Sequence, residues 1–478
     1  MEELEFSEIH DEISDDFHRL KEQENVSHDS LLDFLRNKCF AKSSANSLKA
    51  FGIISSLINR VTLAAINLYD FSNMYPSEPD YEMKVLQLLA AKKAENIFLF
   101  AIYKEGLNRA APLIDQSILT EITKFTNLVH IIINQRQFLL KDLMKMCENL
   151  LSLSRFHVVI DLGSELPVDD PQFVQKFSNS FDKIKEFVFA LTVQVLEDKE
   201  KAKNFTGELT NFGVKHLPNL HRISAFGIPY DMSQGCKEME KTSKLQYMRL
   251  SAIHLEEFAS KFDKFPSVQT LVVSWNNVND FGKDSNINKE KLKLLKEFTK
   301  INELRLTNMT SFEYLEVLLK NTGPKLKFLN LYCDTKHKMK VNLKQIQDTC
   351  PSLSTLEIHV DDVEETQSMV TFKSLKQLQI IYHTDSSEKV CLSNLLSPPN
   401  LEVVHLEGFQ VTKQELQETT LKIQAQAILT KVNLIKLCLS RGISTKLKKA
   451  IKNECRLLVS AVQKMWHIDK ESATFEFL

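Results

Sequence analysis

Residues 268–278 read Val268-Gln269-Thr270-Leu271-Val272-Val273-Ser274-Trp275-Asn276-Asn277-Val278. Apolar residues occupy the first, fourth, sixth and eleventh places of this stretch, and an asparagine occupies the ninth. Side chains along a β-strand point alternately to its two faces, so the residues at the fourth and sixth places share one face. The stretch therefore predicts a short strand with one buried face, followed by a turn.

The frame made by the first, fourth and sixth places recurs along most of the chain. Its first place is held in chain order by Ile97, Leu128, Leu153, Ile184, Leu220, Leu245, Val268, Ile301, Leu326, Leu353, Leu375, Leu401 and Leu434. Segments between these places, such as residues 140–150, carry apolar residues at the three- and four-residue intervals that are typical of helices. The asparagine is found at its place in one unit alone, Asn276, so no regular asparagine ladder is expected.

This alternation of strand, turn and helix, repeated roughly every 28 residues, resembles the leucine-rich-repeat family. The resemblance implies an α/β solenoid with a curved parallel sheet, outer helices and helical N- and C-terminal caps. The predicted order is an acidic flexible tail (1–27), a helical unit (28–80), about thirteen irregular repeats (81–444) and a helical cap (445–478). The cap is expected because apolar residues recur at helical spacing from Leu447 to Met465.

Composition and motifs favour a non-catalytic intracellular protein. The chain has 60 Lys+Arg against 62 Asp+Glu, without the basic excess typical of nucleic-acid binders. The acidic N-terminus, the lack of a long apolar run and eight scattered cysteines predict a cytoplasmic or nuclear protein with reduced thiols and no membrane partner. No Walker-type, G-x-G-x-x-G, H-E-x-x-H or C-x-x-C motif occurs, so no enzyme activity and no cofactor are expected.

Two further groups of residues are interpreted as loops. Cys333 and His337 have no second pair of metal ligands nearby, so no metal site is expected there. The acidic run of residues 361–365 is interpreted as a solvated turn between a strand and a helix.

A compact helical unit is predicted ahead of the repeats, where Leu31, Leu32, Phe34 and Leu35 begin an apolar helix after a capping segment. In layout, such a unit before repeats resembles the F-box adaptors of cullin-type ubiquitin ligases, which implies that these four residues contact the Skp linker protein. The segment lacks the Leu-Pro opening and the closing tryptophan of that family. The alternative is a helical unit that only covers the end of the repeat core.

Cys147 and Cys350 lie in stretches that resemble the C-x-x-L turn of cysteine-containing repeats, a subclass common in F-box proteins. A small buried thiol at a helix end is an equally sufficient interpretation of both.

The same register predicts a surface. If the fourth and sixth places face inward, the third, fifth and seventh face outward. In the middle repeats the outward set is Tyr247, Arg249, Glu303, Arg305, Phe328, Asn330 and Tyr332, with Trp275 one place further on. The flanking repeats present His130, Arg155, His157, Arg222, Glu357, His359, His405 and Glu407. Tyrosine, tryptophan and arginine dominate interface hot spots, so the middle set predicts a partner-binding face, although aromatic residues also favour strands for structural reasons.

The sequence therefore predicts a protein-recognition module. Its most specific form is the substrate-recognition subunit of a Skp–cullin–F-box ubiquitin ligase, with the linker and cullin held through residues 28–62. The alternative is a scaffold or regulatory binder outside any ligase. A third class, a phosphate or nucleic-acid binder, would use the lysine-rich stretches 289–300 and 336–340, which are interpreted as solvated outer surface.

Overall fold

The computed structural model describes residues 65–69, 79–93, 95–104, 111–191, 198–228, 230–255, 259–275, 292–309, 311–333, 339–364, 368–383, 390–440, 445–466 and 472–477. The chain divides into two compact units, an N-terminal unit (residues 1–230) and a C-terminal unit (residues 231–478). The predicted helical segment with Leu31, Leu32, Phe34 and Leu35 lies outside the described residues, as do Asn276, Val278 and His337.

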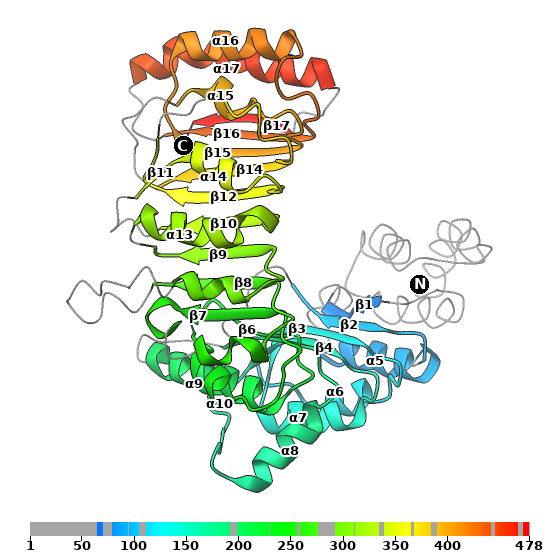
Figure 1. The fold of residues 1–478 in the computed structure, drawn as a ribbon. Coiled ribbons are helices and arrows are strands. Elements are labelled where there is room, and N and C mark those ends of the chain that lie inside the picture. The colour runs from blue at the N-terminus through cyan, green and yellow to red at the C-terminus, as the bar shows by residue number, and fades with distance from the viewer. Residues whose placement is uncertain are drawn as a thin grey trace, which may run out of the picture. The chain divides into compact units, whose positions relative to one another are not determined.

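The N-terminal unit is built on a six-stranded parallel sheet in sequential order (Figure 1). Its strands are β1 (Ala65–Asn67), β2 (Leu99–Ile102), β3 (His130–Phe138), β4 (Arg155–Ile160), β5 (Glu186–Leu191) and β6 (Arg222–Phe226). Its described helices are α5 (Pro79–Lys93), α6 (Gln116–Ile122), α7 (Leu140–Asn149), α8 (Pro171–Phe181) and α9 (Asp198–His216). Successive helices pack together, as α5 on α6 and α7 on α8, so strands and helices form two layers.

The C-terminal unit repeats this plan with a nine-stranded parallel sheet. The strands of this sheet are β7 (Tyr247–Ser251), β8 (Thr270–Ser274), β9 (Glu303–Thr307), β10 (Phe328–Tyr332), β12 (Thr355–Val360), β14 (Gln377–Tyr382), β15 (Val403–Phe409), β16 (Leu434–Leu439) and β17 (Ala473–Phe477). Two short strands, β11 (Lys340–Val341) and β13 (Asp362–Val363), pair separately.

The segments that connect these strands differ in length. The described α-helices are α10 (Ser233–Glu238), α13 (Phe312–Thr322), α14 (Leu343–Thr349), α15 (Leu392–Leu395), α16 (Lys413–Gln424) and α17 (Thr445–Trp466). The described 3-10 helices are η3 (Ala252–His254), η4 (Ala259–Lys264), η5 (Lys293–Glu297) and η6 (Gly323–Lys325). Among these described segments, α13, α16 and α17 are the longest.

Alternating burial shows why these residues form strands. In β10, Leu329 and Leu331 are fully buried while Phe328, Asn330 and Tyr332 are not. In β12, Leu356 and Ile358 are buried in the same way. The inward leucines and isoleucines of neighbouring strands stack beneath the connecting helices and form a continuous apolar core. Parallel strands with helical returns and stacked apolar rungs form the predicted α/β leucine-rich-repeat solenoid.

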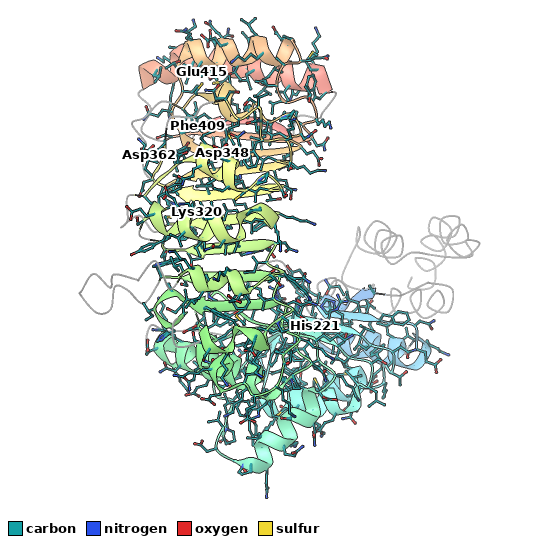
Figure 2. The ribbon with its side chains drawn as sticks, viewed as in Figure 1. His221, Lys320, Asp348, Asp362, Phe409 and Glu415 are labelled. Atoms are coloured by element: carbon teal, nitrogen blue, oxygen red, sulfur yellow. The ribbon has the colours of Figure 1, made fainter. Side chains whose placement is uncertain are left out.

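Polar side chains fix the helix starts. The Asn342 side chain accepts a hydrogen bond from the backbone N–H of Gln345, and the Thr412 hydroxyl accepts one from Glu415. Glu415, which Figure 2 labels, does not bond back to Thr412. Its carboxylate accepts the backbone N–H of Ser393 at 2.7 Å. Glu415 therefore connects α16 to the start of α15, and this contact joins two successive repeats.

Twelve of the thirteen predicted repeats begin in the predicted register, because each strand starts two residues after the predicted first place. The predicted first place of the thirteenth repeat, Leu434, was wrong by two residues. Leu434 pairs with Val403 on the outward side and is 42% exposed, while Val432 is buried and holds the first place. A slip of two residues keeps the same side chains inward, so alternation alone could not detect it.

Each sheet also extends one strand beyond the predicted array. β1 pairs with β2 ahead of the first predicted repeat. At the other end, α17 forms over residues where the helical cap was predicted and packs on α16, but the chain then returns as β17 beside β16. The prediction of a wholly helical segment 445–478 was therefore wrong for residues 473–477.

Of the described cysteines, Cys147, Cys236, Cys333, Cys350, Cys391 and Cys455 are free thiols. Cys147 lies in the last turns of α7 and Cys350 directly follows α14, and both are buried. Burial raises the pKa of the Cys350 thiol to about 11. These two thiols are small core side chains at helix ends, as the simpler interpretation predicted.

Candidate functional site

The outward side chains of the nine-stranded sheet form the surface that the register predicted. We call the outward side chains of β7–β10, β12, β14 and β15 the C-terminal open face. Register sets three cross-strand rows over the first five of these strands. They are Tyr247–Thr270–Glu303–Phe328–Thr355, Arg249–Val272–Arg305–Asn330–Glu357 and Ser251–Ser274–Thr307–Tyr332–His359. The residues predicted in the middle repeats, other than Trp275, therefore lie on neighbouring strands of one sheet face.

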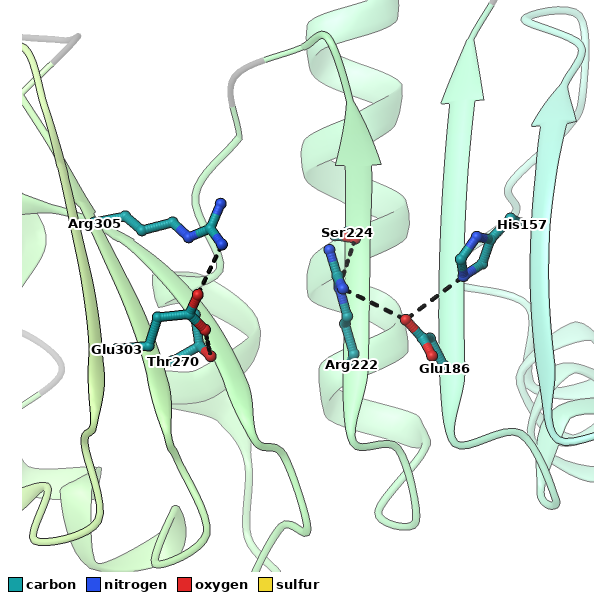
Figure 3. Close-up of polar contacts among 7 residues, drawn as sticks. All are labelled: His157, Glu186, Arg222, Ser224, Thr270, Glu303 and Arg305. Carbon is teal, nitrogen blue, oxygen red and sulfur yellow. Dashed lines mark hydrogen bonds and ion pairs between the residues drawn. The ribbon is translucent and has the colours of Figure 1, made fainter. Parts of the chain in front are cut away.

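Arg305 is the centre of a polar group at the β8–β9 part of this face. Its guanidinium donates to the Glu303 carboxylate at 2.7 Å, and Glu303 also accepts the hydroxyl of Thr270 (Figure 3). The guanidinium carbon lies 4.9 Å from the centre of the Phe328 ring, within the range of a cation–π contact. The side chain of Arg305 remains 45% exposed. These contacts hold an accessible cation against an aromatic ring.

Three rings meet on the next part of the face. The Tyr332 ring centre lies 5.5 Å from that of His359 and 5.6 Å from that of His383, and the two imidazoles are 6.1 Å apart. Tyr332 is 44% exposed. Burial, helped by the neighbouring His383, lowers the pKa of His359, so this imidazole is neutral at neutral pH. His383 was not among the predicted residues, because it follows β14 and the frame does not extend that far.

Carboxylates border the rings on adjacent strands. Glu357 accepts a hydrogen bond from the Asn330 amide at 2.7 Å. Glu407 lies 3.4 Å from the Nε2 atom of His405. Acidic, basic, amide and aromatic side chains are thus interleaved over β9–β15, a mixture suited to recognising a protein surface.

Trp275 does not belong to this face, so the prediction was wrong at this position. Its side chain is only 2% exposed and stacks on Tyr314 of α13, with ring centres 6.3 Å apart. The physical reason is parity: Leu271, Val273 and Trp275 follow one another at steps of two, so all three point inward. This signal was present in the sequence.

Tyr247 and Arg249 are half-buried on β7, at the edge of the sheet. Between Arg249 and Arg305 lies Val272, which is only 3% exposed although its place is outward. Long arginine side chains commonly cover apolar neighbours with their methylene groups. The arginines therefore shield a valine as well as presenting charge.

The acidic run after β12 differs from the predicted solvated turn. Asp361 is 7% exposed, and Asp362 with Val363 forms β13 against β11. Asp362 lies 3.2 Å from Lys340 (Figure 2). Only part of this run is solvated, because pairing with β11 draws it back onto the repeat.

Within the described residues, no group of three or more His, Cys, Asp or Glu side chains could hold a metal ion. None of the described helices combines the length and the apolar character needed to cross a membrane.

Sequence comparison returns no match, either to a protein-family model or to a curated protein. Among solved structures, the chain is similar to a TLR13–ssRNA13 complex, with 13% identity, a TM-score of 0.36 and 72% of this chain covered. The chain spans about half, 49%, of that TLR13 chain. It is also similar to a leucine-rich-repeat protein of Leptospira interrogans, with 13% identity, a TM-score of 0.34 and coverage of 83% of this chain and 86% of the other.

A third similar structure is the plant peptide hormone receptor RGFR1 in complex with RGF2. It has 12% identity and a TM-score of 0.22, with 74% of this chain and 73% of the other covered. The assignment of the fold rests on the strand ladders and burial pattern described above.

Proposed function

We propose that the chain is a protein-recognition module and that its partner binds the C-terminal open face. The observation that supports this most directly is the exposure of Tyr332 and Arg305, each held in place by ring contacts to its neighbours. Ordered aromatic and arginine side chains lose little conformational freedom on binding and are enriched at interface hot spots. Polar neighbours such as Glu303 and Glu357 supply directional contacts around them.

The double variant Arg305→Ala/Tyr332→Ala tests this surface. We expect the Kd of the purified partner, identified by native co-purification, to rise about 30- to 800-fold, since two hot-spot side chains of about 1–2 kcal/mol each contribute about 2–4 kcal/mol together. Both side chains lie at the surface, exposed by 45% and 44%, so Tm is expected to change much less than on removal of a buried side chain. Calorimetric titration and thermal unfolding of the full chain measure both quantities.

The matched control is Lys344→Ala/Leu421→Ala, which removes one cation and one large exposed side chain from α14 and α16. It should leave the Kd unchanged. If this control weakens binding as much as the face variant, or if neither does, the partner does not use the C-terminal open face.

The more specific form of the proposal is a substrate-recognition subunit of a Skp–cullin–F-box ubiquitin ligase. In this form residues 28–62 hold the linker, and the C-terminal open face holds the target. It is supported by the order along the sequence, in which a segment predicted to be helical precedes the leucine-rich repeats. The alternative, a scaffold or regulatory binder, needs no ligase and uses the same face.

Co-purification separates these two forms. If the ligase form holds, the full chain retains the Skp linker and a cullin, and the quadruple substitution of Leu31, Leu32, Phe34 and Leu35 by alanine abolishes their retention but not target binding. Target binding without any ligase component would establish the scaffold form instead.

A further inference from the structure

The sheet of the N-terminal unit has an open face of its own, with a different chemistry. We call the outward side chains of β2–β6 the N-terminal open face. Register places His130, Arg155, Glu186 and Arg222 in one row across β3, β4, β5 and β6. His157 and Ser224 lie one step further along the same face. Two guanidinium groups thus face one carboxylate.

The carboxylate is shared between two partners. Glu186 Oε1 lies 3.4 Å from a terminal nitrogen of Arg222 and 3.5 Å from Nε2 of His157 (Figure 3). The Nε atom of Arg222 donates to the Ser224 hydroxyl at 3.2 Å. These contacts orient Arg222 while 45% of its side chain stays exposed. Arg155 is exposed on β4, next to Glu186 of β5. The row contains no second carboxylate to match the charge of Arg155.

The imidazole of His130 can add further charge. The rings of His130 and His157 meet edge to face with centres 5.0 Å apart. Burial, the second imidazole and Arg155 all lower the pKa of His130, and Glu186 opposes them. On β2, the outward neighbours Leu99 and Ala101 are apolar. His130 is therefore neutral at neutral pH and gains a proton as the solution is acidified, which makes the face more positive.

An apolar group accompanies the charges. Phe226 ends β6, two places after Ser224 on the same face, and is 70% exposed, the largest exposure among the described large hydrophobic side chains. Its ladder neighbour on β5 is the small residue Ala190. An exposed phenylalanine on the same face as the oriented Arg222 and the exposed Arg155 offers both parts of an anchor for an acidic segment that carries an apolar side chain.

We propose that the N-terminal open face is a second docking surface, which binds an acidic segment of a protein partner through Arg155, Arg222 and Phe226 and binds it more tightly as the pH falls from 7.5 to 5.5. Charge complementarity identifies the occupant. The face carries the guanidiniums of Arg155 and Arg222 but only one carboxylate, Glu186, and that carboxylate is already shared by Arg222 and His157. This surface is independent of the partner proposed for the C-terminal open face.

The test uses the full chain and a fluorescent peptide of six glutamates and one phenylalanine. A fluorescent peptide of six lysines, which carries the opposite charge, is the negative control. Anisotropy at pH 7.5 should show binding of the acidic peptide alone, tightening about threefold or more at pH 5.5. Arg155→Ala/Arg222→Ala should weaken it about five- to tenfold at both pH values. The matched control is Lys141→Ala/Lys145→Ala, which removes two exposed cations from α7. It should leave the binding of the acidic peptide unchanged.

Two more variants exclude misfolding as the cause of a loss. Glu186→Gln removes the one carboxylate of the row and should tighten acidic-peptide binding. His130→Gln should keep binding at pH 7.5 and lose the gain at pH 5.5. Equal binding by the wild type and the double-arginine variant would overturn the proposal. So would tighter binding of a single-stranded RNA of equal charge that depends on both arginines, because the occupant would then be a nucleic acid.

Discussion

Trp275→Ala is expected to lower the free energy of unfolding of the C-terminal unit by about 3–5 kcal/mol, the usual cost of removing a buried tryptophan. The side chain is 2% exposed and fills the space between β8 and α13, where it stacks on Tyr314. The cavity left by its removal would therefore lie between β8 and α13 (Phe312–Thr322).

Chemical denaturation of the full chain measures this effect, with Tyr332→Ala as the comparison. Tyr332 is a large ring in the same unit but is 44% exposed on the C-terminal open face. Its removal should cost less than about 1 kcal/mol, as for other surface substitutions. Equal losses for the two variants would contradict the inward placement of Trp275.

Gly408→Ala has the second large expected effect, a loss of about 2–5 kcal/mol. Gly408 lies in β15 at a positive φ of 78°, where the register with β16 shifts between Glu407 and Phe409. A left-handed backbone costs a residue with a Cβ about 1–2 kcal/mol. The added Cβ would also lie 2.5 Å from the carbonyl oxygen of Tyr382, and such overpacking costs about 1–3 kcal/mol. Glycine is needed here because β14 and the bulge of β15 approach so closely.

Gly227→Ala is the matched control. Gly227 has nearly the same φ, 77°, but an added Cβ would meet no atom within 4 Å. It should lose only the backbone contribution of about 1–2 kcal/mol. The difference between the two variants, measured by thermal unfolding, isolates the contact with Tyr382. A larger loss for Gly227→Ala would contradict this explanation of the bulge.

The repeating part of the fold was predictable because each strand carries its own local signal. The apolar frame located β2–β10, β12, β14 and β15 in register, twelve strands in all. It missed β1, which has only three residues, the two-residue strands β11 and β13, and β17, which follows a strong helical pattern in residues 445–466. The slip at Leu434 has another cause, because a shift of two residues leaves the same side chains inward and only pairing with β15 decides the register.

The candidate face was predictable in its members but not in its contacts. Alternation placed Arg305, Phe328 and Tyr332 outward, and the structure agrees. The cation–ring contact between Arg305 and Phe328 depends on which strands pair, and so does the cluster of Tyr332, His359 and His383. No single-strand pattern contains this information. The partner-binding role of the face stays a prediction.

Oxidative footprinting of the full chain, with and without the purified partner, shows whether the partner covers the C-terminal open face. Hydroxyl radicals label exposed tyrosine and leucine side chains, so Tyr332 on the C-terminal open face and Leu421 on α16, exposed by 44% and 65%, report on opposite layers of one unit. We predict that the partner strongly reduces labelling of Tyr332 and leaves labelling of Leu421 unchanged. Protection of Leu421 with undiminished labelling of Tyr332 would contradict the claim, because the partner would then bind the helical layer.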